Sequence, residues 1–305
     1  MFQRDIFINE VSKGLNKDKN IFFLSADFGA PSLDDLRKNF PNNFLHCGIS
    51  EQAMLDIAAG LALEGKKVFV YAMAPFLALR SIEQAKCGAG LMKLPICLLS
   101  VGVGLGYADA GPTHYTTEDF ACFRSIVGSS IYTPSDVQTT QLIAKKMLAK
   151  TEFSYIRLDR DKLPNIYEKI NDAEFNKGYK LFGKPDSKKI ALISHGKMLH
   201  KCLKIYNNDP EKLVCVDIFR SKPFPESLPK TLSSCKGIVV VDEQSPSGNL
   251  SSCIFEGFSS QNYFPKIVTN SLPEKYVFEN GGREYLLNTF GLSEIDILNS
   301  IKKIL

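Results

Sequence analysis

Short apolar runs alternate with helical patterns along the first half of the 305-residue chain. Each run is short enough for a buried strand, and each intervening segment repeats its apolar residues at helical spacing. The predicted strands are 21–25, 67–72, 95–101, 130–135 and 153–158. The predicted helices are 33–39, 50–64, 76–91, 117–126 and 136–149. Strands that alternate with helices indicate a parallel sheet covered on both faces.

The pattern lapses between 159 and 188, where the sequence is polar and interrupted by Pro and Gly. A second series then predicts strands at 190–194, 213–219, 237–242 and 266–270, with helices at 196–206, 249–259 and 293–303. The predicted fold class is therefore α/β, with two domains, each a mostly parallel sheet flanked by helices. The predicted boundaries are 1–162 and 189–305, joined by a linker at 163–188.

Composition narrows the class of protein. The formal net charge of +4 is too small to indicate a nucleic-acid partner, and no apolar run is long enough to predict a membrane segment. The eight cysteines form no CxxC pair, and several lie in apolar runs, which is typical of reduced, buried thiols. We therefore expect a cytoplasmic protein. His195 and His200 are spaced poorly for paired ligands, so no metal site is predicted on this chain.

The segment "ISEQAMLDIAAGLALEG" predicts a helix with an acid at its entrance. Ser50 is the expected N-cap, and Glu51 then takes the first helical position, where the helix dipole favours an anion. Taken alone, this arrangement is typical of ordinary helix starts. The helix is apolar nearly all round, however, and such helices are buried. A buried carboxylate is suited to sharing a proton with a ring nitrogen.

The stretch "FPNNFLHCGISEQAMLDIAAGLALEGKKVFVYAMAPFLALRSIEQ" resembles the pyrimidine-binding domain of thiamine-diphosphate enzymes of the transketolase family. The earlier "ADFG" segment (26–29) and the later "GREYL" and "FGLSE" segments extend the resemblance over nearly the whole chain, including the family's C-terminal domain. The resemblance implies thiamine diphosphate as cofactor. It also implies that Glu51 hydrogen-bonds a nitrogen of the cofactor's pyrimidine ring and activates it.

Phe76 lies where a predicted strand gives way to a helix, at the edge of the sheet where α/β proteins bind ligands. The resemblance implies that Phe76 stacks on the pyrimidine; the alternative is an ordinary core phenylalanine. The roles of Leu79 and Arg80 stay open.

The loop "VGVGLGYADAGPTH" resembles the family's substrate loop. Its glycines are not followed at once by a helix, so a dinucleotide site is not favoured. The resemblance implies that His114 faces the substrate, where an imidazole can move a proton on a hydroxyl. Asp109, displaced by one residue from the family's pattern, is a second candidate for substrate binding. This displacement leaves the sugar substrate open and allows a specialised sugar.

Two more residues are candidates for substrate binding. The resemblance implies that Arg160, in "SYIRLDR", contacts a sugar phosphate, since a guanidinium fits a phosphate well. The alternative is a surface ion pair with Asp159 or Asp161. His46 is expected at a strand end beside the same cleft, in a supporting role.

The Gly-Asp-Gly motif that holds the diphosphate through Mg²⁺ in this family does not occur in the sequence. The resemblance therefore implies an N-terminal transketolase-like partner subunit that carries the Mg²⁺ ligands, with a homodimer of this chain inside an α2β2 assembly. The implied reaction moves a two-carbon ketol unit between sugar phosphates. A 1-deoxyxylulose-5-phosphate synthase-like enzyme, the beta subunit of a 2-oxo acid dehydrogenase, and a non-catalytic scaffold are the alternatives.

Overall fold

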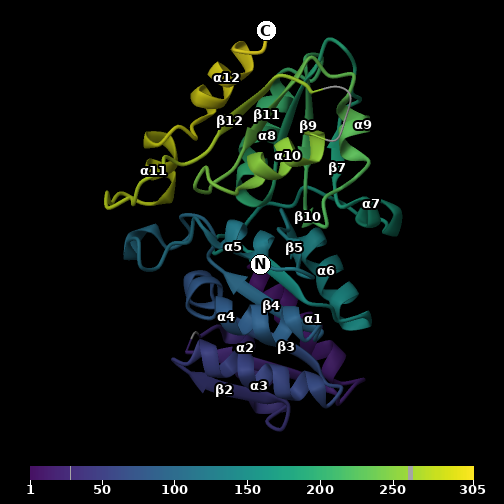
Figure 1. The fold of residues 1–305 in the computed structure, drawn as a ribbon, viewed down its shortest axis with the longest axis vertical. Coiled ribbons are helices and arrows are strands. Elements are labelled where there is room, and N and C mark those ends of the chain that lie inside the picture. The colour runs from purple at the N-terminus through teal and green to yellow at the C-terminus, as the bar shows by residue number, and fades with distance from the viewer. Residues whose placement is uncertain (28, 260–263) are drawn as a thin grey trace.

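The computed structural model describes residues 1–27, 29–259 and 264–305, and shows two sheets arranged along the long axis of the molecule (Figure 1). The seven-stranded sheet has the order β10-β5-β6-β4-β3-β1-β2, and the five-stranded sheet has the order β12-β11-β8-β9-β7. Phe28, within the "ADFG" segment, lies outside the described residues.

The first sheet is formed by β1 (Ile21–Ala26), β2 (Phe44–Gly48), β3 (Lys67–Met73), β4 (Ile96–Val101), β5 (Ser130–Tyr132), β6 (Ser154–Leu158) and β10 (Arg220–Lys222). The second is formed by β7 (Lys180–Phe182), β8 (Ile190–Ser194), β9 (Leu213–Asp217), β11 (Gly237–Val241) and β12 (Ile267–Asn270). Among the strands of the described residues, only β10 and β7 pair antiparallel with their neighbours, so the predicted mostly parallel α/β class is confirmed.

The helices that surround the first sheet are α1 (Gln3–Leu15), α2 (Pro31–Asn39), α3 (Glu51–Leu63), α4 (Ile82–Gln84), α5 (Asp119–Ser125) and α6 (Val137–Ala149). Two π-helical stretches, η1 (Phe76–Arg80) and η2 (Ala85–Leu91), flank α4, and a short 3-10 helix, η3 (Ala108–Ala110), lies in the following loop. The remaining helices are α7 (Asp172–Lys177), α8 (Gly196–Asn208), α9 (Leu228–Leu232), α10 (Leu250–Ser259), α11 (Arg283–Thr289) and α12 (Glu294–Lys302). None of the helices in the described ranges has the length and apolar character that a bilayer-spanning helix needs.

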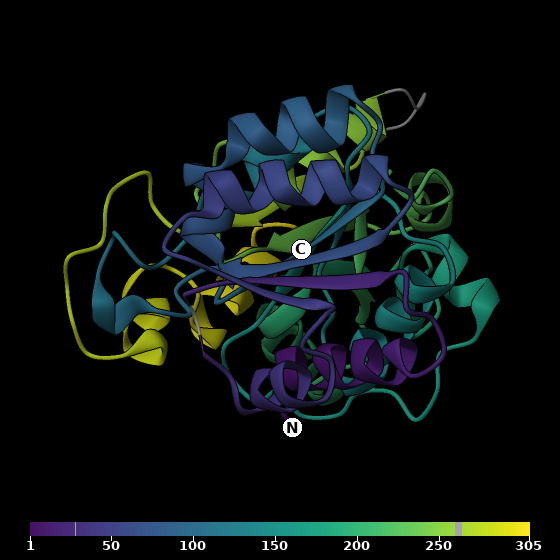
Figure 2. The same ribbon diagram turned by 90° about the horizontal axis from the view of Figure 1, so that it is seen from below.

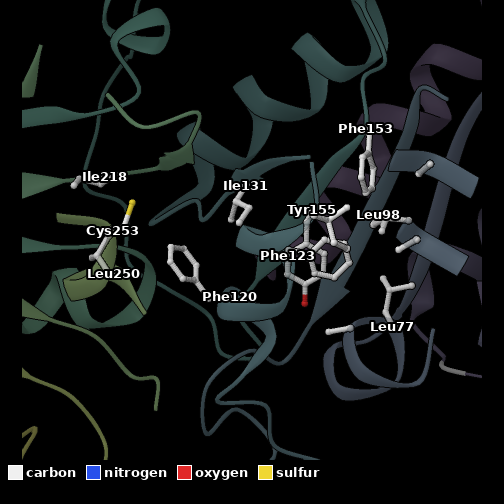
Figure 3. Packing of buried hydrophobic residues seen from close by; sticks show 14 of the residues in the cluster. Leu77, Leu98, Phe120, Phe123, Ile131, Phe153, Tyr155, Ile218, Leu250 and Cys253 are labelled. Atoms are coloured by element: carbon white, nitrogen blue, oxygen red, sulfur yellow. The ribbon is translucent and has the colours of Figure 1, made fainter. Parts of the chain in front are cut away.

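Helices cover both faces of the first sheet, as Figure 2 shows from below. Because successive strand residues point to opposite faces, Phe23 packs under α1, α2 and α6, while Leu24 packs under α3. The core on the α3 side of the first sheet continues to the second half of the chain. Phe120 and Ile131 of the first half share one core cluster with Ile218 and Leu250 of the second half (Figure 3). The two sheets are thus joined by a continuous apolar core.

The structure differs from the sequence-based predictions in several elements. The N-terminal helix α1 was not predicted. The polar segment expected as a linker contains α7 and β7, and β7 pairs with β9. The division into 1–162, 163–188 and 189–305 stays a prediction.

Helix α3 is not buried all round, as its composition had suggested. It buries Met54, Leu55, Ala58 and Ala62 but exposes Ile57. The reason is that α3 lies on the outside of the molecule beside the η1–η2 segment (Figure 2), so its outward face meets no other element among the described residues.

Candidate active site

Glu51 begins α3 and is only 3% exposed. It follows β2, the edge strand of the first sheet, at the carboxyl end of the parallel strands. The predicted N-cap role of Ser50 is wrong. Its hydroxyl donates to the carbonyl of Cys47 at 2.5 Å and caps no amide of α3. The carboxylate of Glu51 is nevertheless buried at the positive end of the helix, as the sequence predicted.

Arg80 is the partner of Glu51. Its Nη1 donates to Glu51 Oε2 at 2.6 Å, and its guanidinium carbon lies 4.3 Å from the centre of the Phe76 ring. Phe76 and Arg80 are the first and last residues of η1, which follows β3. A π-helical stretch is a frequent feature of functional sites, and here it places Arg80 so that the guanidinium contacts both Glu51 and the ring of Phe76. Sequence reasoning assigned no role to Arg80, because nothing in the local pattern indicates a distant acid.

His114 also contacts Phe76. The two rings meet edge to face, with centroids 5.5 Å apart and an interplanar angle of 76°. The imidazole Nδ1 is 2.8 Å from the Thr113 hydroxyl oxygen, which fixes the orientation of the ring. The structure therefore brings Glu51, Phe76 and His114 together, although 63 residues of sequence separate the first from the last.

Arg160 follows β6 and is linked to the base of the His114 loop. Its Nη1 donates to the carbonyl of Gly106 at 3.1 Å, and its guanidinium carbon lies 4.5 Å from the centre of the Tyr107 ring. Burial raises the pKa of Tyr107, although the nearby Arg160 charge opposes this shift. The alternative of an ion pair with Asp159 or Asp161 is not realised among the described residues, because both carboxylates are bound by Arg283.

Asp109 and His46 are both exposed. Asp109 lies in η3, on the same loop as His114, and His46 lies on β2. In the described ranges, no hydrogen bond, ion pair or ring contact joins either residue to Glu51, Phe76 or His114. Their roles stay predictions.

The site fits the pyrimidine part of thiamine diphosphate. A buried carboxylate accepts an N–H from a flat group that lies over an aromatic ring, and an aminopyrimidine presents both features. The second carboxylate oxygen, Glu51 Oε1, takes part in no hydrogen bond with the residues that the structure describes. Within those residues, no cluster of three or more His, Cys, Asp or Glu side chains is arranged to hold a metal ion.

Comparison with known proteins identifies a family for the part of the chain that contains this site. The family described as "Transketolase, pyrimidine binding domain" matches residues 3–165. The chain is 29% identical over 296 residues to a subunit of apulose-4-phosphate transketolase from Phocaeicola vulgatus, with 95% of this chain and 93% of that protein covered. It is also 27% identical over 269 residues to "1-deoxy-D-xylulose-5-phosphate synthase" from Nitrosomonas europaea, covering 87% of this chain and 42% of the synthase. The chain thus spans less than half of that longer relative.

The fold has a close counterpart among solved structures. The structure described as "Split gene transketolase, inactive beta4 tetramer" superimposes with a TM-score of 0.85 and covers 100% of this chain and 98% of that one, at 24% identity. The likeness extends over both sheets, so the second half of the chain has the fold of that protein as well. The residues of the candidate site all lie within the range 3–165 that the family model matches. The chain belongs to the transketolase pyrimidine-binding domain family.

Proposed function

We propose that this chain is the pyrimidine-binding subunit of a thiamine-diphosphate-dependent, transketolase-like enzyme that transfers a two-carbon ketol unit between sugar phosphates. The observation that carries the proposal is the buried Glu51 carboxylate. It accepts an N–H from the flat guanidinium of Arg80, which lies over the Phe76 ring where a pyrimidine could lie instead. The Phocaeicola relative supports the reaction class, and its name makes apulose 4-phosphate a substrate to test.

Each candidate residue of this chain has its own role in the proposed reaction. Glu51 shares a proton with a nitrogen of the pyrimidine ring, and the ring of Phe76 stacks on the face of the pyrimidine. His114 moves a proton on a substrate hydroxyl, Asp109 and His46 support substrate binding, and Arg160 binds the phosphate. When bound, thiamine diphosphate supplies the electron sink for carbon–carbon bond cleavage.

We further propose that the diphosphate and Mg²⁺ are held by an N-terminal transketolase-like partner subunit in an α2β2 assembly. The outward faces of α3 and the η1–η2 segment support an interface, because they expose apolar side chains that include Ile57 and Leu79, each 43% exposed, and Leu91, 77% exposed. All eight cysteines are free thiols, which supports a cytoplasmic location.

The test begins with calorimetric titration of thiamine diphosphate and Mg²⁺ into the chain alone and into its mixture with the partner subunit. We expect tight binding only in the mixture. The mixture is then given a ketose phosphate and an aldose phosphate, and the products are analysed for transfer of two carbons. Tight binding by the chain alone would overturn the two-chain site.

A second candidate is a 1-deoxyxylulose-5-phosphate synthase-like activity, which the match to the Nitrosomonas enzyme supports. It predicts CO₂ release from pyruvate rather than ketol transfer. The same mixture, supplied with pyruvate and an aldose phosphate, separates the two activities.

A further inference from the structure

Arg283 binds two buried carboxylates that follow strands of different sheets, and its Nη1 also donates to the half-exposed Asp161 at 3.1 Å. Its Nη1 and Nη2 donate to Asp159 Oδ1 and Oδ2 at 2.7 and 2.9 Å, and its Nε and Nη2 donate to Glu243 Oε1 and Oε2, both at 2.7 Å. Asp159 follows β6 of the first sheet, while Glu243 follows β11 of the second. Such paired, parallel hydrogen bonds fix orientation as well as distance.

This cluster is buried. The exposed fractions of the side chains are 9% for Arg283, 4% for Asp159 and 7% for Glu243. Burial by itself would lower the pKa of Arg283, but the carboxylates of Asp159 and Glu243 outweigh it and raise that pKa. The guanidinium therefore stays charged, and the two carboxylates depend on it for their counter-charge.

Glu243 extends the cluster to the base of the His114 loop. Its Oε1 accepts the backbone N–H of Leu105 at 2.9 Å. Gly104 makes this approach possible, since its φ is +62° and a Cβ there would lie 2.8 Å from Glu243 Cδ. The Glu243 side chain of the second half therefore fixes the position of the backbone where the His114 loop begins.

The far end of the loop is also tied to the second half. Gln244 Nε2 donates to the carbonyl of Thr116 at 3.2 Å, and the Ser245 N–H donates to the carbonyl of Thr117 at 3.0 Å. The Tyr115 hydroxyl accepts the N–H of Val277 at 2.7 Å. His114 thus lies between two anchored ends, although it makes its own ring contact with Phe76 of the first half.

We propose that Arg283 and Glu243 are positioning residues: they hold the 103–117 loop so that His114 meets Phe76. This role rests on the proposed function, because it gives the second half of the chain a task in the ketol transfer. Arg283 also holds Asp159, the neighbour of Arg160, so one guanidinium orients both substrate-contacting segments.

The test uses Glu243→Asp in the full chain assembled with its partner. Aspartate keeps the charge that faces Arg283, but it is one methylene shorter and withdraws from the Leu105 N–H. Removal of Arg283 would leave two buried carboxylates unpaired and can unfold the chain, so Arg283→Met and Arg283→Lys serve as a second pair. Arg124→Met is the matched control, because Arg124 pairs with Glu256 between the same two halves without contacting residues 103–117.

Amide hydrogen exchange and kinetics are measured together. We expect faster exchange at Leu105 in Glu243→Asp and a fall in kcat of about tenfold or more, with the affinity for thiamine diphosphate unchanged. Arg283→Lys should recover part of the kcat that Arg283→Met loses, since an ammonium keeps the charge without the paired geometry.

Each other outcome is decisive. Exchange and kcat equal to those of Arg124→Met would overturn the positioning role. Faster exchange with unchanged kcat would also overturn it, while the proposed function stands. A wild-type complex without ketol transfer would overturn the proposed function, and the positioning role falls with it.

Discussion

Arg80 and Glu51 form an ion pair between a half-exposed cation and a buried anion. The side chain of Arg80 is 39% exposed, whereas that of Glu51 is 4% exposed, and Nη1 and Oε2 are 2.6 Å apart. The guanidinium also lies over Phe76. It therefore occupies both the Glu51 carboxylate and the Phe76 ring face, which are the two contacts that a flat pyrimidine would need. Because the guanidinium covers the ring of Phe76, we expect Arg80 to move away from Phe76 and Glu51 when the cofactor binds under the proposed function.

Substitution Arg80→Leu should therefore destabilise the cofactor-free chain more than the loaded complex. Without cofactor the buried carboxylate loses its partner, which we expect to cost about 1–3 kcal/mol. Thiamine diphosphate would supply a new hydrogen-bond donor and remove most of this cost. Melting temperatures with and without cofactor measure the difference. Arg37→Leu, which breaks an exposed pair with Asp34, is the control, and an equal loss in both states would contradict the exchange of partners.

Glu51→Gln should lower the turnover of the assembled complex by about 100-fold or more, because glutamine cannot share a proton. Assembly, measured by analytical ultracentrifugation, should be preserved. Glu64→Gln is the control, since Glu64 directly follows the same helix as its C-cap and is exposed. Full activity of Glu51→Gln in an intact complex would instead favour a non-catalytic scaffold.

His114→Gln should lower kcat by about 100-fold while the affinity for thiamine diphosphate stays the same. The imidazole contacts the ring of Phe76 and the hydroxyl of Thr113, and no contact with Glu51 is found among the described residues. His46→Gln should have a smaller effect, because His46 is exposed on the edge strand. A similar fall in kcat in the two variants would contradict the assignment of proton transfer to His114 and a supporting role to His46.

Arg160→Leu should impair phosphorylated substrates selectively. Loss of a charged hydrogen bond costs about 1.5–3 kcal/mol, which corresponds to a fall in kcat/KM of roughly 10- to 100-fold. The same ketose without its phosphate serves as the internal control and should be unaffected. A matching loss for both substrates would show that Arg160 acts through Gly106 and Tyr107, which it contacts in the structure.

Asp217 should make stability depend on pH. It is fully buried, and accepts hydrogen bonds from Tyr167 and Ser135 at 2.7 and 2.8 Å. Burial raises its pKa to about 7 from the usual 3.8, so the protonated form is favoured in the folded chain. This stabilisation is complete below about pH 4 and is lost as the pH rises toward 7, by about 1.4 kcal/mol per pH unit.

Asp217→Asn should flatten that dependence, because an amide does not titrate. Urea unfolding of both proteins between pH 4 and 8 measures the difference in slope, which cancels the contribution of all other groups. Identical slopes would show that Asp217 is ionised in the folded chain throughout this range.

Much of the fold could be predicted because short apolar runs mark most strands and apolar residues recur at helical spacing between them. The strand predicted at 21–25 corresponds to β1, and the helix predicted at 136–149 corresponds to α6, which has a capping box at Asp136. The strands β7 and β10 have three residues each, too few to show an alternation. Their pairing depends on neighbours that are distant in sequence.

The proximity of some candidate residues could be predicted where a motif contains them, while their roles stay predictions. Glu51, Phe76 and His114 stand in recognisable segments, and the structure brings them together. Nothing in the sequence indicated the ion pairs of Arg80 and Arg283, because each pairs with an acid that is far away in the chain. An arginine at a helix end has no local signal that distinguishes a surface charge from the counter-ion of a buried acid.

The π-helical geometry of η1 also affects how relatives are to be aligned. In such a stretch each hydrogen bond spans one residue more than in an α-helix, so the segment behaves as a one-residue insertion. A relative that continues the same turn as an α-helix has a different register after Phe76. Counting columns from the phenylalanine then pairs Arg80 with a residue that faces another direction, so the residue that meets the glutamate has to be identified from superimposed backbones.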